Sequence, residues 1–412
     1  IHSMQIPMDK LQDIYKKYDK NKLITKLDNH KIVKFGGFAG NYQIKIQEKT
    51  GGKISVDVGT IIIAGGTKQY PPAEGQFKYG ISSSVMTQSE FQEKYDKKGL
   101  RKISRAVILL CVNQRLDPES KYYSQVRNQF GSEFLTTSNC SNVCCARSLK
   151  IAKQIKEQNE NAEIFVLYRD MQLTGGKLEQ VYRELKNDVV FLRYDSAAEI
   201  EPKIIKEGGS GANGRIYISF NEVNTKTKIG LEADILVLAT PIATSEKTLD
   251  LARLLKIRTE KYGFFQEEHS KVLPLNSTRK AIFLCGSVQW PNNPDLEVSQ
   301  ALGAAMKAAN FLAEGYYEGL AEVAEIDKDK CIGCGTCIRL CPYKAITFNI
   351  EAKHYVFGDR NIRKAEVNPL ICQACGICMS ECPVNAIIIP NSNDGAYINM
   401  IAQFAEGKEE GN

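Results

Sequence analysis

Two groups of cysteines near the C-terminal end of the chain share one spacing. Each follows the pattern C-x2-C-x2-C-x3-C, and a proline, Pro342 or Pro383, comes directly after it. Two 4Fe-4S clusters need eight thiolates in this order, because each loop supplies three ligands and the fourth cysteine reaches across to the other cluster. Paired zinc knuckles and disulfides are the alternatives, but neither explains the doubled spacing with its prolines. The expected ligand sets are Cys331, Cys334, Cys337 with Cys382, and Cys372, Cys375, Cys378 with Cys341.

A third cysteine group lies in the middle of the chain. Cys140, Cys144 and Cys145 form C-x3-C-C, and Cys111 ends an apolar strand expected over residues 106–110. Cys111 occupies the strand-to-loop turn in which a nucleotide-binding domain places its first glycine, so the site looks converted from phosphate binding to thiolate chemistry. Buried structural cysteine is the competing interpretation, because free cysteine packs well as a small hydrophobe. Cys285, which belongs to no set, is expected to pack in this way.

The composition is that of an ordinary globular chain. Its 412 residues are 43% hydrophobic and 25% charged. The formal charge of +6 is spread over short basic segments without the interleaved aromatic residues of a nucleic-acid groove, so no nucleic acid is expected as a partner. The longest apolar runs have strand length, and no membrane span is expected. Thirteen cysteines, with metal ligation and not disulfides as their expected main use, indicate a reducing compartment, hence the cytoplasm.

The elements that must position the middle cysteines alternate between strands and helices. Apolar strands are expected over residues 106–110, 163–168 and 189–193, with helices over 144–158 and 176–187. This alternation predicts a parallel sheet with right-handed crossovers.

A second pattern is repeated on either side of that sheet. Residues 31–66 and 215–243 each read as a meander followed by a buried strand that ends in alanine, which suggests duplicated nucleotide-type domains. A last strand over 280–284 leads into an Ala-rich helix over 297–314. A literal G-x-G-x-x-G at Gly209, Gly211 and Gly214 is rejected as a dinucleotide site, because it precedes a strand instead of a helix.

Motifs spread along nearly the whole chain resemble, in order, those of the A-type subunit of heterodisulfide reductases. Individually they are weak, and their order makes the match specific. The double ferredoxin pattern at the C-terminal end is part of this resemblance. The other segments are Phe35 to Tyr42, Val85 to Glu90, Cys111 to Arg115, Cys140 to Cys145, Tyr168 to Asp170, Gly263 to Phe265 with His269 and Lys271, and Gly286 with Pro291 and Gln300.

The resemblance implies an α/β flavoprotein with two dinucleotide-binding domains, like thioredoxin reductase, followed by a C-terminal α+β double 4Fe-4S ferredoxin domain. The FAD domain would comprise a partial first part over residues 1–98 and a second part over 241–320. Between them, residues 99–240 would form an inserted nicotinamide-type domain that has lost its nucleotide, and residues 321–412 would form the ferredoxin domain. In that family the inserted domain holds a third 4Fe-4S cluster, which implies as its ligands Cys111, Cys140, Cys144 and Cys145.

The same resemblance implies an FAD site. A strand-end turn would lie beside the flavin, and the N-terminus of the Ala-rich helix would stabilise negative charge at flavin N1 and O2 with free backbone N–H groups. A plain packing helix is the alternative. The family's pyrophosphate-binding G-x-G-x-x-G is expected before Ile1 or on another chain. The implied cofactor-binding residues are Ala64, Gly65, Gly66, Gly286, Val298 and Gln300.

The resemblance also implies catalytic roles for two residues. Lys150 would approach the flavin N5 edge, where a cation stabilises an anionic reduced flavin, and Glu90 would be its carboxylate partner. Without the resemblance, Lys150 reads as a surface helix residue.

The function implied is that of a flavin- and iron-sulfur-dependent oxidoreductase subunit that transfers electrons in an oligomeric complex. Flavin-based electron bifurcation is a further hypothesis, with ferredoxin as a partner, hydrogenase or formate dehydrogenase subunits on one side and disulfide-reducing subunits on the other. The alternatives are a related subunit of a quinone-interacting or benzoyl-CoA reductase complex, and a polyferredoxin relay that binds no flavin.

Overall fold

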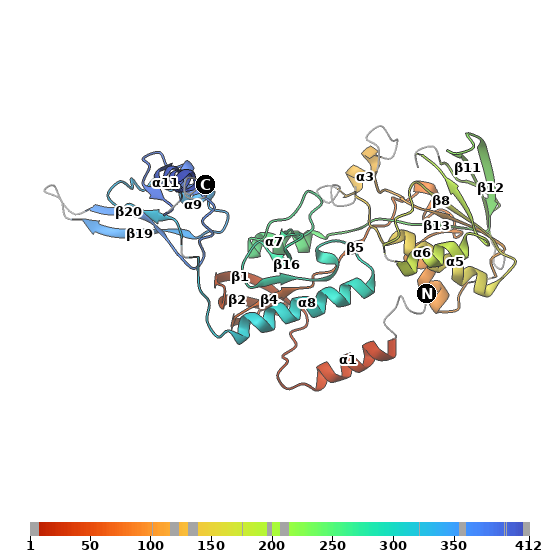
Figure 1. Cartoon of the computed structure of the whole chain (residues 1–412). Helices are drawn as coiled ribbons and strands as arrows, with labels where there is room; N and C mark the ends of the chain where they lie inside the picture. The colour runs from red at the N-terminus through yellow and green to blue at the C-terminus, as the bar shows by residue number, and fades with distance from the viewer. Residues whose placement is uncertain are drawn as a thin grey trace.

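The chain forms three bodies that follow one another in space (Figure 1). The computed structural model describes residues 8–100, 102–115, 123–130, 139–174, 176–195, 200–206, 214–320, 322–353, 360–390, 392 and 394–406. Gly209 and Gly211 of the rejected glycine motif lie outside the described residues. No helix in the described part of the chain is both long and apolar enough to cross a membrane.

The first body is built on a five-stranded sheet in the order β6-β13-β7-β8-β9. Every neighbouring pair is parallel, as the alternating pattern predicts. The central strands are almost continuously apolar because both of their faces are covered. The strands are β6 (Val85–Thr87), β13 (Ile235–Leu238), β7 (Arg105–Leu109), β8 (Glu163–Tyr168) and β9 (Val190–Arg193).

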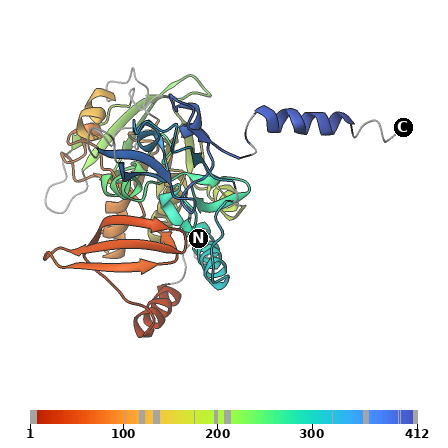
Figure 2. The same ribbon diagram turned by 90° about the vertical axis from the view of Figure 1, so that its left-hand side faces the viewer.

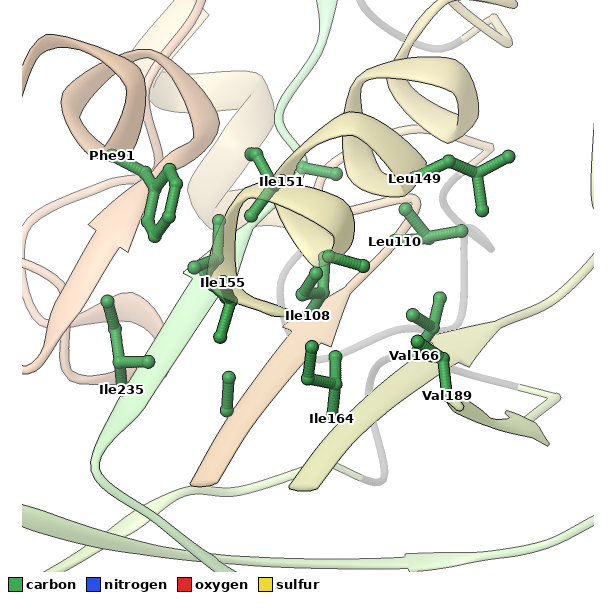
Figure 3. Packing of buried hydrophobic residues seen from close by; sticks show 14 of the residues in the cluster. Phe91, Ile108, Leu110, Leu149, Ile151, Ile155, Ile164, Val166, Val189 and Ile235 are labelled. Atoms are coloured by element: carbon green, nitrogen blue, oxygen red, sulfur yellow. The ribbon is translucent and has the colours of Figure 1, made fainter. Parts of the chain in front are cut away.

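Helices pack on one face of this sheet. Ile108 and Ile164 from the strands meet Phe91, Ile151 and Ile155 from the helices in one fully buried cluster (Figure 3). The three helices are α2 (Gln88–Asp96), α5 (Cys144–Gln158) and α6 (Gly176–Leu185). The bounds of α5 and β8 are those predicted from the sequence.

A three-stranded meander covers the other face of the sheet. Ile216, Ile218 and Phe220 alternate inward along β11 and pack on Leu109 and Leu236. This antiparallel meander consists of β10 (Lys203–Lys206), β11 (Arg215–Asn221) and β12 (Lys228–Ala233). A second meander in the middle body has the same plan, with β1 (His30–Phe38), β2 (Asn41–Glu48) and β3 (Lys53–Val58). The predicted repeat of a meander followed by a buried strand is therefore confirmed, although β3, β10 and β12 were not predicted as strands.

The middle body is split in sequence. Its four-stranded sheet has the order β15-β16-β17-β4. Strand β4 comes before the first body in the chain and β17 comes after that body, yet the two strands lie side by side and parallel. The two connecting segments run side by side, because β5 (Lys68–Gln69) pairs with β14 (Ile242–Ala243). The elements of this body are β4 (Ile61–Ile63), α7 (Glu246–Leu255), β15 (Glu267–His269), β16 (Leu273–Ser277), β17 (Ile282–Leu284) and α8 (Pro294–Ala313).

This topology confirms the predicted fold class, an interrupted thioredoxin-reductase-like α/β fold with an inserted parallel-sheet domain. It also corrects one boundary. Strand β6 joins the sheet of the inserted body through β13 and is followed by α2, so the inserted body begins near residue 85 and not at 99. A three-residue strand is too short to show a period in the sequence, which explains the error.

The third body has two antiparallel pairs and two short helices that follow the cysteine loops. The pairs are β18 (Glu325–Ile326) with β21 (Ile387–Ile388), and β19 (Ile346–Lys353) with β20 (Arg360–Val367); the helices are α9 (Thr336–Leu340) and α10 (Ile377–Ser380). A final helix, α11 (Asp394–Glu406), extends away from the rest of the chain (Figure 2). The remaining elements are α1 (Met8–Lys20), α3 (Tyr123–Phe130) and the 3-10 turns η2 (Gln76–Lys78) and η5 (Gly286–Val288).

Candidate iron-sulfur centres and flavin-facing turns

Two cavities in the third body are each lined by four cysteines. One, of about 340 Å³ including its open mouth, is lined by Cys331, Cys334, Cys337 and Cys382 among apolar side chains. The other, of about 330 Å³, is lined by Cys341, Cys372, Cys375 and Cys378. The structure thus brings together the two sets expected from the sequence, and each includes the fourth cysteine of the opposite loop.

The loops that carry three of the four cysteines adopt matching backbone conformations. Gly333 and Gly335 have φ angles of 70° and 75°, and the equivalent Ala374 and Gly376 have 48° and 81°. Left-handed residues at alternate positions turn successive backbone N–H groups into one concavity, which suits an anion such as a cluster with its sulfides. Gly333 is also required sterically, because a Cβ there would lie 2.3 Å from the carbonyl oxygen of Arg363.

The surroundings of these cysteines suit thiolates bound to a cluster. The backbone N–H of Ala345 donates to Cys341 Sγ at 3.3 Å, and that of Ala386 donates to Cys382 Sγ at 3.3 Å. Such hydrogen bonds stabilise anionic sulfur and raise the potential of a bound cluster. Among the described residues no three His, Cys, Asp or Glu side chains converge as the ligands of a single ion do. A cubane cluster needs a wider spacing of its ligands, because its four thiolates bind four separate irons around a cavity.

The third cysteine group gathers where β7 ends and α5 begins. Cys111 follows β7, Cys144 and Cys145 form the first turn of α5, and these three are buried while Cys140 is half-buried. Burial, reinforced by Cys145 and Cys140 nearby, raises the pKa of Cys111 to about 12. A thiol in this position stays protonated unless a metal compensates its charge.

The backbone around this group shows the alternation found in the third body. Cys111, Asn113 and Arg115 have φ angles of 55°, 60° and 51°, and Asn142, between Cys140 and Cys144, has 56°. None of these is glycine, so each position carries a conformational cost that is typical of functional sites.

Buried amide side chains surround the same cysteines. Gln114 Nε2 donates to Ser141 Oγ, and Gln114 Oε1 lies 3.7 Å from Cys144 Sγ. Asn139, which directly precedes Cys140, is 4% exposed, and neither its side-chain oxygen nor its nitrogen has a partner in the part of the chain that is described. Buried amides are nearly always hydrogen-bonded, so this orphaned amide fits a site that a cluster completes. Neither Gln114 nor Asn139 was predicted from the sequence, because no local pattern indicates which amide side chains are buried beside a cysteine.

The turns expected to face the flavin lie at the carboxyl ends of two parallel strands. Ala64, Gly65 and Gly66 follow β4, while Gly286 follows β17, and Cys285 N donates to Ile63 O at 3.0 Å between the two strand ends. Gln300 joins them, because its Oε1 accepts from the N–H of Gly286 at 3.0 Å. This edge of an open α/β sheet is where such folds bind their ligands.

The start of the Ala-rich helix differs from the expectation. Helix α8 begins at Pro294 instead of Glu297, with proline in the first turn. Proline is favoured there because its missing N–H costs no helical hydrogen bond. The N–H of Glu297 already donates to Asn293 O at 3.1 Å, so the N–H groups of Val298 and Gln300 lie within the hydrogen-bonded turns and are not free for a flavin.

The expected pair of Lys150 with Glu90 is not formed. Glu90 accepts hydrogen bonds from Thr87 N at 2.7 Å and Tyr79 Oη at 2.9 Å, which makes it the acidic half of a capping box on α2. Lys150 is half-buried on α5, and its pKa is lowered by that burial, while Asp96 raises it. The motif of a threonine three residues before a glutamate was the sequence signal for this cap.

The capping role of Glu90 has a testable consequence. Thr87→Ala is expected to lower the free energy of unfolding by about 1 kcal/mol, because it removes the side chain that accepts from the N–H of Glu90. Glu90→Ala should have a similar effect, measured by denaturant unfolding followed by circular dichroism. Lys94→Ala on the same helix is the exposed control. A neutral Thr87→Ala with a destabilising Glu90→Ala would contradict the reciprocal cap.

Comparison with known proteins identifies the third body first. Residues 330–386 match the 4Fe-4S dicluster domain family. The chain is 30% identical over 285 residues to a protein from Archaeoglobus profundus that is named as similar to the A-type subunit of heterodisulfide reductase; the match covers 67% of this chain and 36% of that protein. It is 27% identical over 318 residues to the A-type iron-sulfur subunit of the CoB–CoM heterodisulfide reductase of Methanocaldococcus jannaschii, covering 74% of this chain and 45% of that protein.

A further relative is the A-type subunit of the H2/formate:CoB-CoM heterodisulfide,ferredoxin reductase of Methanococcus maripaludis, at 26% identity over 77% of this chain and 46% of that protein. The chain therefore spans less than half the length of the curated relatives named here. Among solved structures, bacillithiol disulfide reductase from Bacillus cereus matches with a TM-score of 0.41 at 11% identity, over 75% of this chain and 78% of that one. The fold class rests on the sheet topology and not on this likeness.

Proposed function

The chain is a relative of the A-type subunits of heterodisulfide reductases along most of its length and carries a 4Fe-4S dicluster domain, and from this we propose that it is an electron-transferring oxidoreductase subunit. The observation that carries the proposal is the pair of cysteine-lined cavities, each completed by a cysteine from the opposite loop. Clusters of this kind pass single electrons, whereas a flavin exchanges one or two.

A third 4Fe-4S cluster held by Cys111, Cys140, Cys144 and Cys145 is part of the proposal. It is supported by the alternating left-handed residues of the Cys111 to Arg115 turn and by the orphaned amide of Asn139. The buried amides would hydrogen-bond cluster sulfur and hold the ligand turns in place.

The flavin site is proposed at the carboxyl ends of β4 and β17, in a middle body of the FAD-binding type. The turns at Gly66 and Gly286 have φ angles of 63° and 71°, and a Cβ at either position would meet nothing within 4 Å, so both leave room for a ligand. Strand β4 is an edge strand with Ile62 43% exposed, and it pairs only with β17 among the described residues. A further parallel strand and helix, carrying the pyrophosphate-binding glycines, would complete the sheet there.

The protein would work within a larger complex. By likeness to relatives named for heterodisulfide and ferredoxin reduction, we propose disulfide-reducing subunits, hydrogenase or formate dehydrogenase subunits, and ferredoxin as partners in a reducing cytoplasm. Flavin-based bifurcation is the finer form of the proposal. The alternative is that the chain is a subunit of a related quinone-interacting or benzoyl-CoA reductase complex. The identity of the neighbouring subunits distinguishes these complexes from a heterodisulfide-reductase-type complex.

Anaerobic purification followed by an absorbance spectrum tests the flavin. We expect FAD to be released on denaturation of the full-length protein or of its complex, in addition to the broad absorbance of the clusters. Full cluster content without flavin in the intact complex would support the polyferredoxin relay instead. Reduction of ferredoxin by a two-electron donor without any high-potential acceptor would exclude bifurcation.

A further inference from the structure

One of the two dicluster sites faces the middle body. A cavity of about 270 Å³ between the bodies is lined by Tyr42 and Arg279 on one side and by Tyr343 and Gln373 on the other. Tyr343 and Gln373 also line the cavity that contains Cys341, Cys372, Cys375 and Cys378. We call this cysteine set the inner site, and the set of Cys331, Cys334, Cys337 and Cys382 the outer site.

Arg279 is a buried cation at this boundary. Its side chain is 8% exposed, and its guanidinium carbon lies 5.0 Å from the ring centroid of Phe35 and 5.8 Å from that of Tyr42. No carboxylate lies within ion-pair distance of it in the described ranges of the chain. Aromatic faces compensate only part of the cost of burying a charge, so the site favours a further negative group.

Other cations lie near the inner site. The pKa of Lys256, at the end of α7, is lowered by burial and by the nearby Arg279 and Lys344, while Cys341 raises it. Lys280, which lines the boundary cavity, is paired with Glu268, whose Oε1 lies 2.7 Å from Lys280 Nζ. The charged side chains named here therefore carry a net positive charge, and most of it comes from the middle body.

A 4Fe-4S cluster with four thiolates is an anion, and reduction adds one more negative charge. A nearby cation stabilises the reduced form more than the oxidised form, which raises the reduction potential. We infer that Arg279, with Lys256, provides the counter-charge of the inner cluster and raises its potential when the third body is docked on the middle body. Neither residue is a cluster ligand, so both act on the inner cluster only through the positive charge of their side chains.

The inference has a reciprocal consequence. If docking raises the potential of the inner cluster, reduction of that cluster must tighten docking by the same free energy. The arrangement therefore favours the docked position when an electron has reached the inner site. This inference rests on the proposed function, because docking would control electron transfer through the inner cluster.

Redox titration of the full-length, anaerobically reconstituted protein, followed by electron paramagnetic resonance, tests the inference. The Cys382→Ala variant, which is expected to lack the outer cluster, assigns the inner signal. In Arg279→Gln we expect about tenfold less reduced inner cluster at a fixed potential, equivalent to about 59 mV for one electron, with the outer signal unchanged. Arg279→Lys should restore most of the wild-type potential, because it keeps the charge.

Arg253→Gln is the matched control, since this exposed arginine on α7 pairs with Asp250 at 2.9 Å. Lys256→Gln repeats the test at an exposed position if Arg279→Gln does not fold. An inner potential unchanged in the folded Arg279 and Lys256 variants, with full iron content, would overturn the inference. Wild-type protein without two reducible dicluster signals would instead count against the proposed function.

Discussion

Cys382→Ala is expected to abolish the cluster of the Cys331 loop and to leave the cluster of its own loop intact. The reason is that Cys382 lines the outer cavity together with Cys331, Cys334 and Cys337, while Cys372, Cys375 and Cys378 are completed by Cys341. About four irons per chain should be lost, and the remaining dicluster signal should be that of the inner site. Iron analysis with electron paramagnetic resonance of the anaerobic protein measures both.

The mirror variant, Cys341→Ala, should give the opposite result and retain the outer cluster. Double variants then locate each loss: adding Cys334→Ala to Cys382→Ala should remove no further cluster, whereas adding Cys375→Ala should remove the second. If Cys382→Ala and Cys375→Ala acted on the same cluster, the crossed assignment would be wrong.

Cys144→Ala is expected to remove the third cluster and about four further irons, with both dicluster signals preserved. Cys144 lies in the first turn of α5 beside Cys145, Cys111 and Cys140. The control is Cys285→Ala, because Cys285 is also buried but packs with Phe283, Ala304 and Ala308 and belongs to no cysteine set. Iron content should be unchanged in this control.

The alternative for the middle group is that its cysteines are structural. In that case Cys144→Ala and Cys285→Ala would both lower stability while iron content stayed at the wild-type value. Circular dichroism on each variant separates loss of the fold from loss of the metal.

The sequence predicted best what depends on local spacing. The cysteine loops are short and regularly spaced, and the two cavities are lined by the cysteine sets that this spacing predicts, including the crossed Cys341 and Cys382. Helix α5 and strand β8 were predicted with their observed bounds, because the apolar residues of α5 recur with a helical period over 15 residues and β8 is a short apolar run.

What the sequence did not reveal depends on tertiary contact. Strand β6 is three residues long and is held by its pairing with β13, so its own residues carry little signal. The assignment of Glu90 to Lys150 failed because a local cap competed for the carboxylate. Arg279 is informative only through its burial at the boundary between the middle and third bodies. Asn139 is informative only through its burial directly before Cys140.

Quantifying iron and acid-labile sulfide in the anaerobically reconstituted full-length protein tests the central claim most directly. Three 4Fe-4S clusters predict about twelve of each per chain, and photoreduction should reveal three separate cluster signals. A value of about eight, with only the dicluster signals, would contradict the third cluster proposed for the inserted body.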